Sequence, residues 1–509
     1  MMANQLGQQD VMVVMDQAIY CKAKQIIWAH PEDYQRVILR MGAFHITCNF
    51  LGILGQRFGD AGLKDILAEN EIIALGSLPT VLNGHHYNRA IRAHKIVFEA
   101  LLRLKWTNFR SWLTQNQEMS VHYENLMALL KAINESNLKD QYQNLLDSPE
   151  FDMILQAYDS YKSQEDGPMS VFWESYISLV QLLLNFIRSI REGNWSLHKT
   201  CLRKMLPWMF AYDHTNYSRY LTVYLWDMLQ LDKTHPNAHI RMNDGEFVVQ
   251  RSKNAFSQVP VDQTIEQTIN RDSKTPGGII GFSLNSSAMQ RWILTSHERA
   301  AITQSCRSMA GLDNEGTRPH KEASRQRVAN DEDCVKQVVS FLSDERNPFQ
   351  ASRDLVSISS GVVAEDTVKD DLLNAEEIGE SALQEFMKSR LNSDVANFFD
   401  PLKKLSLGTF SNKSKQKGNK GKETTMKAEF DFYSRTLVIA QSRQLDLREV
   451  FTYELGNTPP SLASAEGGLC KNVKAHLGHQ LEKKVENQPM LTHIPGSTFI
   501  IDGMSVPTQ

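Results

Sequence analysis

The stretch from Val11 to Phe58, VMVVMDQAIYCKAKQIIWAHPEDYQRVILRMGAFHITCNFLGILGQRF, decides how the chain is interpreted. It opens with five apolar residues, Val11–Met15, between polar ones, which is the pattern of a buried strand. Asp16 follows at the carboxyl end of that strand, where ligands and catalytic groups gather in open α/β sheets. Residues 18–29 predict a helix, and residues 37–39 predict a second, parallel strand reached by a right-handed crossover.

Asp16 has two interpretations on the residues alone. The plainer one is an ordinary βαβ unit in which Asp16 caps the helix that follows it. The other starts from the order strand, Asp16, helix, strand, His45, helix, which places an acid and a histidine at neighbouring strand ends. The residues alone leave both interpretations open.

Composition sets the class of protein. The 509 residues are 41% hydrophobic and 22% charged, with a net charge of −4, so the chain is globular and any nucleic-acid contact must come from local patches. The six cysteines are scattered without a C-x-x-C pair, so we expect neither a disulfide framework nor a zinc site. The polar start of the chain lacks the pattern of a signal peptide, and no run approaches the ~20 apolar residues of a membrane span. We therefore expect no membrane partner and a nuclear location, with the cytoplasm as the alternative.

The chain after the opening stretch is predicted to be mostly helical. A long helix beginning near His85 carries four basic residues that could contact phosphate, although a solvated helix face is the commoner reason for such a row. These residues are Arg89, Arg92, Lys95 and Arg103. Farther along, the segment Asp213–Tyr220 mixes an acid, a histidine, an amide and aromatics, and fits either a site or a polar helix start.

The segment Val259–Phe282 contains the next candidate acids. Asp262, Glu266 and Asn270 recur every four residues and share one helix face, while three apolar residues, Val261, Ile265 and Ile269, line the neighbouring face and are expected to pack against the sheet. Two carboxylates on one face of an anchored helix can hold a divalent cation, but exposed carboxylates would be unremarkable.

Five parts of the chain follow from these patterns. We expect a partial βαβ core over 9–60, a helical insertion over 61–255 and a helical return to the core over 256–312. Acidic helices and a flexible basic linker occupy 313–429, and an incomplete C-terminal module occupies 430–509. The linker holds a lysine cluster that could contact phosphate or serve in nuclear import, with a solvated linker as the default. Its central members are Lys413, Lys415 and Lys417.

Several short motifs resemble an uncharacterised family of animal proteins derived from mobile elements. More distantly, the order of Asp16 and His45 is similar to RNase H-like transposases of the Mutator, hAT and Kyakuja–Dileera–Zisupton types. The motifs that carry the resemblance are Asp16–Tyr20, Gly42–His45 with Asn49–Leu51, Gly84–Ala90, Asp213–Tyr217, Asp262–Gly278 and Ile501–Met504.

The resemblance implies a fold and a chemistry. The fold class would be an α/β fragment, a partial RNase H-like core, with a large all-α insertion, predominantly helical overall and with a disordered C-terminal portion. RNase H-like transposases use three carboxylates to bind two divalent cations, Mg²⁺ or Mn²⁺, in DNA strand cleavage and transfer. Asp16 would be the second acid and Glu266 the third, with Asp262 beside it and Asp213 as the substitute.

The chain departs from that pattern at the first acid. Only Asp10 precedes Asp16, and it lies too close to belong to a separate strand. We therefore expect a transposase-derived protein truncated at both ends and inactive in this form, with DNA as its partner. The alternative is a domesticated, non-catalytic nuclear DNA-binding or scaffold protein.

Overall fold

The computed structural model describes residues 8–410 apart from 116, 137–140, 165–166, 253, 271–285, 312–320, 344–346, 351 and 392–397, and, beyond these, residues 433, 436–437, 440, 446–452 and 480. By its contacts the chain divides into two units, Met1–Gly456 and Asn457–Gln509. All elements described below belong to the first unit.

The opening stretch forms the predicted βαβ unit. Strand β1 (Val11–Met15) pairs in parallel with β2 (Val37–Met41), with Val11 opposite Val37 and Met15 opposite Met41. Helix α2 (Gln17–Ala29) connects the two strands. The buried side of α2 is centred on Tyr20, whereas Ile19 and Ile26 are 58% and 49% exposed. The parallel sheet has only these two strands among the described residues, and an RNase H-like core is not shown.

Helices make up most of the remaining described structure, as the sequence predicted. The first group comprises α3 (Ala43–Phe58), the π-helical turn η1 (Gly59–Leu63), α4 (Lys64–Glu69), the 3₁₀ turn η2 (Leu75–Ser77), α5 (Leu78–Leu82), α6 (Tyr87–Leu113), α7 (Gln117–Ser136), α8 (Gln141–Leu146) and α9 (Pro149–Gln164). The second group comprises α10 (Pro168–Glu192), α11 (Trp195–Ala211), α12 (Thr215–Leu229), α13 (Leu231–Thr234) and α14 (Pro236–Asn243).

A short hairpin leads the chain back to the first strands. It is formed by β3 (Val249–Gln250) and β4 (Gln258–Val259), which pair antiparallel and lead into α15 (Val261–Ile265) and the π-helical turn η3 (Glu266–Asn270). Two consecutive helices follow farther along the chain, α17 (Ser286–Leu294) and α18 (Ser296–Met309). The last elements are η5 (Lys321–Ala323), α19 (Arg325–Leu342), α20 (Asp366–Leu373), α21 (Ala375–Phe386), η7 (Met387–Leu391) and α23 (Leu447–Val450).

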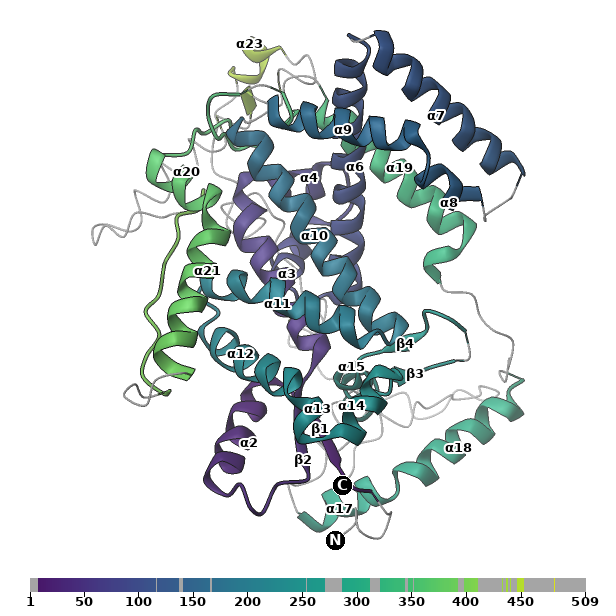
Figure 1. The fold of residues 1–509 in the computed structure, drawn as a ribbon, viewed down its shortest axis with the longest axis vertical. Helices are drawn as coiled ribbons and strands as arrows, with labels where there is room; N and C mark the ends of the chain where they lie inside the picture. Colours follow the sequence, from purple (N-terminus) through teal and green to yellow (C-terminus); the bar gives the residue numbers. More distant parts are fainter. Residues whose placement is uncertain are drawn as a thin grey trace, which may run out of the picture. The chain divides into compact units, whose positions relative to one another are not determined.

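Helix α10 lies at the centre of the main hydrophobic core. Phe172, Trp173 and Tyr176 on this helix are fully buried, and the helix packs against α3, α6 and α11 (Figure 1). By length and composition it is also the one helix in the described part of the chain that could cross a membrane. Because half of its most apolar window is already buried within the protein, that test carries little weight here.

The main core also includes segments from the acidic region beyond residue 313. Val338, Leu342, Leu372 and Phe386 are buried in the same cluster as α3 and α10. Helix α21 packs so closely on α11 that there is no room for a side chain at residue 379. A Cβ atom added at Gly379 would lie 2.1 Å from the carbonyl oxygen of Pro207. The acidic helices are therefore part of the folded unit.

A smaller hydrophobic cluster forms beside the far end of α6. It joins α6 to α7, α8 and α9 through Phe109, Leu126, Ile154 and Tyr161. These helices fold back on α6 and build their own core, which gives the helical insertion two centres of packing.

Candidate functional site

The carboxyl ends of the two parallel strands bring the first candidate residues together. Asp16 follows β1, and its Oδ1 accepts a hydrogen bond of 2.9 Å from the backbone N–H of Ile19. Asp16 is thus the N-cap of α2, as the plainer interpretation of the sequence expected. On the neighbouring strand, the N–H of Gly42 donates to the carbonyl oxygen of Met15 at 2.8 Å, and α3 begins at the next residue.

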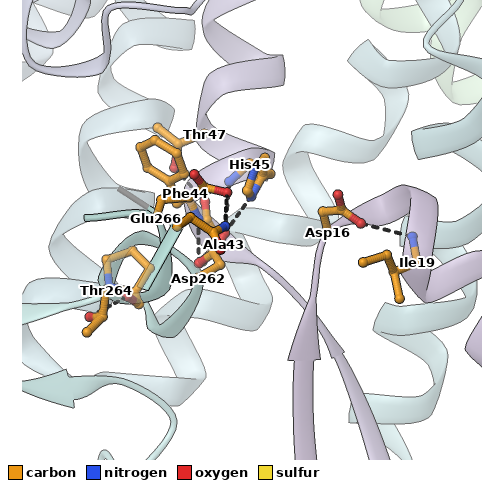
Figure 2. A network of polar contacts seen from close by, with 11 residues as sticks. Asp16, Ile19, Ala43, Phe44, His45, Thr47, Asp262, Thr264 and Glu266 are labelled. Carbon is orange, nitrogen blue, oxygen red and sulfur yellow. Dashed lines mark hydrogen bonds and ion pairs between the residues drawn. The ribbon is translucent and has the colours of Figure 1, made fainter. Parts of the chain in front are cut away.

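Asp262 closes the N-terminus of α3 although it lies far away in sequence. Its Oδ1 accepts a hydrogen bond from the N–H of Phe44 at 3.2 Å, and its Oδ2 accepts one from the N–H of His45 at 3.1 Å (Figure 2). The same Oδ2 lies 3.0 Å from Nδ1 of His45. The first N–H groups of a helix have no partners within the helix, and they carry partial positive charge, so a buried carboxylate is well placed there.

Gly42 is required for this contact. A Cβ atom at residue 42 would lie only 2.2 Å from Oδ2 of Asp262, so any other side chain would displace the carboxylate. Gly42, the residue before α3, thus allows the Asp262 side chain, which is distant in sequence, to approach the backbone closely.

The most buried face of α15 is the acidic one, which neighbours the apolar face that was predicted to pack against the sheet. Asp262 and Gln263 are buried, whereas Val261 and Ile265 are only partly buried, and Ile269 lies among the side chains that are not described. The reason is the N-terminus of α3, which offers hydrogen bonds that polar side chains can satisfy and apolar ones cannot.

His45 lies at the meeting point of three acids. Its pKa is raised, chiefly by the hydrogen bond with Asp262 and against the opposing effect of burial, and the charges of Asp262, Glu266 and Asp16 raise it further. Its side chain is 32% exposed, compared with 6% for Asp262. The arrangement is therefore a histidine oriented by a buried carboxylate and open on its other side, with two further acids near it (Figure 2).

Glu266 has a local partner as well. Its Oε1 accepts a hydrogen bond of 2.8 Å from Nδ2 of Asn270, the third member of the predicted acid–acid–amide row. Asp262 points into the α3 terminus and Glu266 bonds along its own π-helical turn, so the two acids are used in different ways.

A second layer of polar side chains follows on the next turn of α3. Burial raises the pKa of the Cys48 thiol to about 12, which keeps it protonated. Oδ1 of Asn49 lies 2.6 Å from Nδ1 of His214, whose pKa is lowered by burial. Burial also raises the pKa of Tyr217, and the charges of Asp16 and Asp262 act in the same direction.

The described parts of the motif stretches that carried the family resemblance thus converge on α3, while Ile501–Met504 lies outside the described residues. A Cβ at Gly84 would lie 2.1 Å from the carbonyl oxygen of Cys48, and the ring of Tyr87 lies 5.2 Å from that of Phe44. Sequence reasoning did not single out Asn49, Cys48 or Tyr217 as site residues. The signal that could have found Asn49 and Tyr217 was their presence within the quoted motifs, whereas Cys48 lies between two of those motifs.

Asp213 has a different role from that of a substitute third acid. Its two oxygens accept hydrogen bonds from the N–H groups of Leu405 and Ser406, at 2.8 and 2.9 Å. The start of the predicted flexible linker, residues 401–410, is therefore fixed to the helical body, and Gly408 is held in the same way by Asp371 at 2.7 Å. Lys413, Lys415 and Lys417 lie outside the described residues.

Whether these acids could bind a metal ion depends on which of their carboxylate oxygens already accept hydrogen bonds. No group of three or more His, Cys, Asp and Glu side chains within the described ranges is arranged to hold a metal ion. Both oxygens of Asp262 are directed to the α3 terminus, and one oxygen of Asp16 is directed to the start of α2. In this arrangement Asp262 does not fit the role of a ligand in a two-metal site.

The fold and site define a class of predominantly helical protein with a polar site at the ends of two parallel strands. The chain belongs to the family described as a domain of unknown function (DUF8702), whose model matches residues 1–454. No curated protein and no solved structure matches the chain.

Proposed function

We propose that this chain is a transposase-derived protein in which the acids of the ancestral strand-edge site now stabilise the fold, so that it does not cleave DNA in this form. The observation that carries the proposal is the double hydrogen bond from the α3 terminus to Asp262. A carboxylate used in this way has little capacity left for a cation, and two-metal cleavage depends on every acid of its set.

The order of the elements supports the transposase ancestry. An acid follows β1, a histidine follows β2, a long helical insertion comes next, and acids return beside the same strand ends on α15 and η3. Asp16 and Glu266 both act on His45 by their charge, so the positions expected of the second and third acids lie near one histidine.

The proximity of Asp16 and Glu266 to His45 favours a second candidate function, in which the site is still competent to cleave DNA. The two candidates make opposite predictions for Asp16→Asn. Asparagine caps a helix about as well as aspartate, so this variant keeps the role of Asp16 in α2 and removes the negative charge that a cation needs.

The experiment is a nicking assay on supercoiled plasmid DNA with Mg²⁺ or Mn²⁺. Wild type, Asp16→Asn, Glu266→Gln and the exposed control Asp244→Asn are compared. We expect no metal-dependent nicking by any of them and equal thermal stability of wild type and Asp16→Asn. Nicking by wild type and Asp244→Asn that is lost in both other variants would contradict the proposal and establish the second candidate.

A further inference from the structure

Helix α6 is strongly basic, but four of its cations, Arg92, Lys95, Arg103 and Lys105, form ion pairs within the chain. The helix carries six Arg or Lys residues and a single acid, Glu99. Arg92, Lys95 and Arg103 recur along one face at helical spacing. Over a rise of ~1.5 Å per residue, Arg92 and Arg103 lie about 16 Å apart along the axis.

The partners of this row lie on η5 and α19, and Arg103 also pairs with Glu99 of α6 itself at 2.5 Å. Nε of Arg92 lies 2.7 Å from Asp331, and Nζ of Lys95 lies 3.3 Å from Glu322. Arg103 donates two parallel hydrogen bonds to Glu332, at 2.8 and 2.6 Å. The second oxygen of Glu322 lies 3.9 Å from Arg191, at the end of α10, so the row of cations continues onto a second helix.

The two halves of α19 are held in different ways. Val335, Val338 and Leu342 bury the second half in the main core. In the first half, and in η5 before it, none of the described residues between 322 and 334 is buried. This part is held mainly by ion pairs whose side chains are partly exposed, from 24% for Arg92 to 64% for Glu322, and ion pairs near the surface are weak and are screened by salt.

The geometry of the cations fits a polyanion. Forked pairing of Arg103 with a carboxylate is the same contact that arginine makes with phosphate. A row about 16 Å long spans roughly five phosphates of one DNA strand, which carries one charge per ~3.4 Å of helix axis. The acids of η5 and α19 occupy the positions that those phosphates would take.

We propose that the α6 row, Arg92, Lys95 and Arg103 with Arg191 beside it, is a binding surface for the phosphodiester backbone of duplex DNA, covered in this structure by η5 and the first half of α19. Uncovering requires only that this exposed half separate from α6, since the buried half stays in the core. The surface would recognise the charge and spacing of the phosphates, so its binding is independent of DNA sequence.

The proposal does not depend on the strand-edge acids. It survives if the chain cleaves DNA, and the proposed loss of cleavage survives if this surface binds nothing. The nicking assay therefore tests only the proposed loss of cleavage, and the binding assay below tests only the proposed DNA-binding surface.

The test measures binding of the full chain to a fluorescent 25-bp DNA duplex by anisotropy. The uncovered variant is Glu322→Gln/Asp331→Asn/Glu332→Gln, and its charge-matched control is Glu376→Gln/Glu377→Gln/Glu385→Gln on α21. At 50 mM salt we expect the uncovered variant to bind at least ~10-fold more tightly than the control. With four phosphate contacts, its affinity should fall by roughly 150-fold between 50 and 200 mM salt.

Adding Arg92→Gln/Lys95→Gln/Arg103→Gln to the uncovered variant should remove the gain in affinity, so that this combined variant binds no more tightly than wild type. Equal affinities of the uncovered variant and its charge-matched control would overturn the proposal.

A second pair of variants covers the case in which the uncovered variant does not fold. Arg92→Gln/Lys95→Gln/Arg103→Gln in the wild-type chain is compared with Arg203→Gln/Lys204→Gln/Lys233→Gln, which removes the same charge from other helices. We expect the first variant to weaken DNA binding at 25 mM salt at least ~5-fold more than the second. An equal loss in both variants would show that the α6 row is no surface for DNA.

Discussion

Replacing Asp262 by alanine tests the connection between the strand ends and the returning chain. The change removes the acceptors of two backbone N–H groups at the start of α3 and the partner of the His45 ring. Hydrogen bonds to a charged group contribute about 1.5–3 kcal/mol each, but water can partly replace the buried carboxylate, because the neighbouring His45 side chain is 32% exposed. We therefore expect a loss of about 2–4 kcal/mol in the stability of the α3 N-terminus, near the upper end of what single substitutions cost.

Amide hydrogen exchange measured by mass spectrometry reports this loss directly. A loss of about 2–4 kcal/mol corresponds to exchange roughly 30- to 900-fold faster in a peptide covering Gly42–Phe58, if the protecting contact governs local opening. Asp262→Asn keeps one acceptor oxygen and should show a smaller acceleration. The exposed residue Asp244 provides the control, as Asp244→Ala should leave exchange in this peptide unchanged. Exchange in Asp262→Ala within 2-fold of wild type would refute the reasoning.

The pH dependence of the same contact has a definite sign. The pKa of His45 is raised in the folded protein, mainly by Asp262, so protonated His45 stabilises the folded state. That contribution is fully present below the ordinary histidine pKa of about 6.5 and is lost as the pH rises through the raised value. The difference in unfolding free energy between wild type and His45→Gln should therefore be larger at pH 5.5 than at pH 8.5. A difference that grows with pH would contradict this assignment.

Three further predictions concern other parts of the fold. In α3, Gly55→Ala should destabilise the protein by about 2 kcal/mol or more in urea unfolding, because the new Cβ would lie 2.1 Å from the carbonyl oxygen of Leu82. Gly52→Ala should be neutral or stabilising by up to ~1 kcal/mol, because its new Cβ would have its nearest neighbour at 3.8 Å. Burial lowers the pKa of His94 to about 4, so the unfolded state binds an additional proton between pH 6.5 and 4; stability should fall by up to about 3 kcal/mol over that range, and His94→Gln should remove this part of the pH dependence. Asp213→Ala should free the backbone of residues 405–406 and make limited proteolysis there faster, while cleavage elsewhere stays at the wild-type rate.

Local sequence patterns predicted the strands and helices better than they predicted the contacts between distant residues. The five apolar residues before Asp16 gave the first strand, and the apolar spacing after His45 gave α3, because each depends on neighbours within a few residues. The cap on Ile19 is also local and was anticipated. By contrast, the partner of His45 lies 217 residues away, and nothing in the pattern around Asp262 specifies that its carboxylate caps another helix.

The basic residues of α6 illustrate the same limit. Their spacing predicted one charged face, but a charged face has the same sequence pattern whether it contacts water, phosphate or acids of the same chain. Only the structure shows that Asp331 and Glu332 lie against Arg92 and Arg103. Likewise, the composition of residues 401–410 indicated a linker. The contacts that fix this segment are hydrogen bonds that its backbone N–H groups donate to the Asp213 carboxylate, and backbone N–H groups leave no mark in a sequence pattern.

The contact between Asp262 and the start of α3 has a consequence for synthesis of the protein. Residues 44 and 262 are 218 positions apart, so the first helix after the sheet lacks its cap while the ribosome adds the whole insertion. At about 5–20 residues per second this interval lasts roughly 10–40 s. During translation the opening βαβ unit is therefore an unfinished structure with exposed apolar surface, and we expect chaperone binding to the nascent chain to end only after residue 262 has emerged.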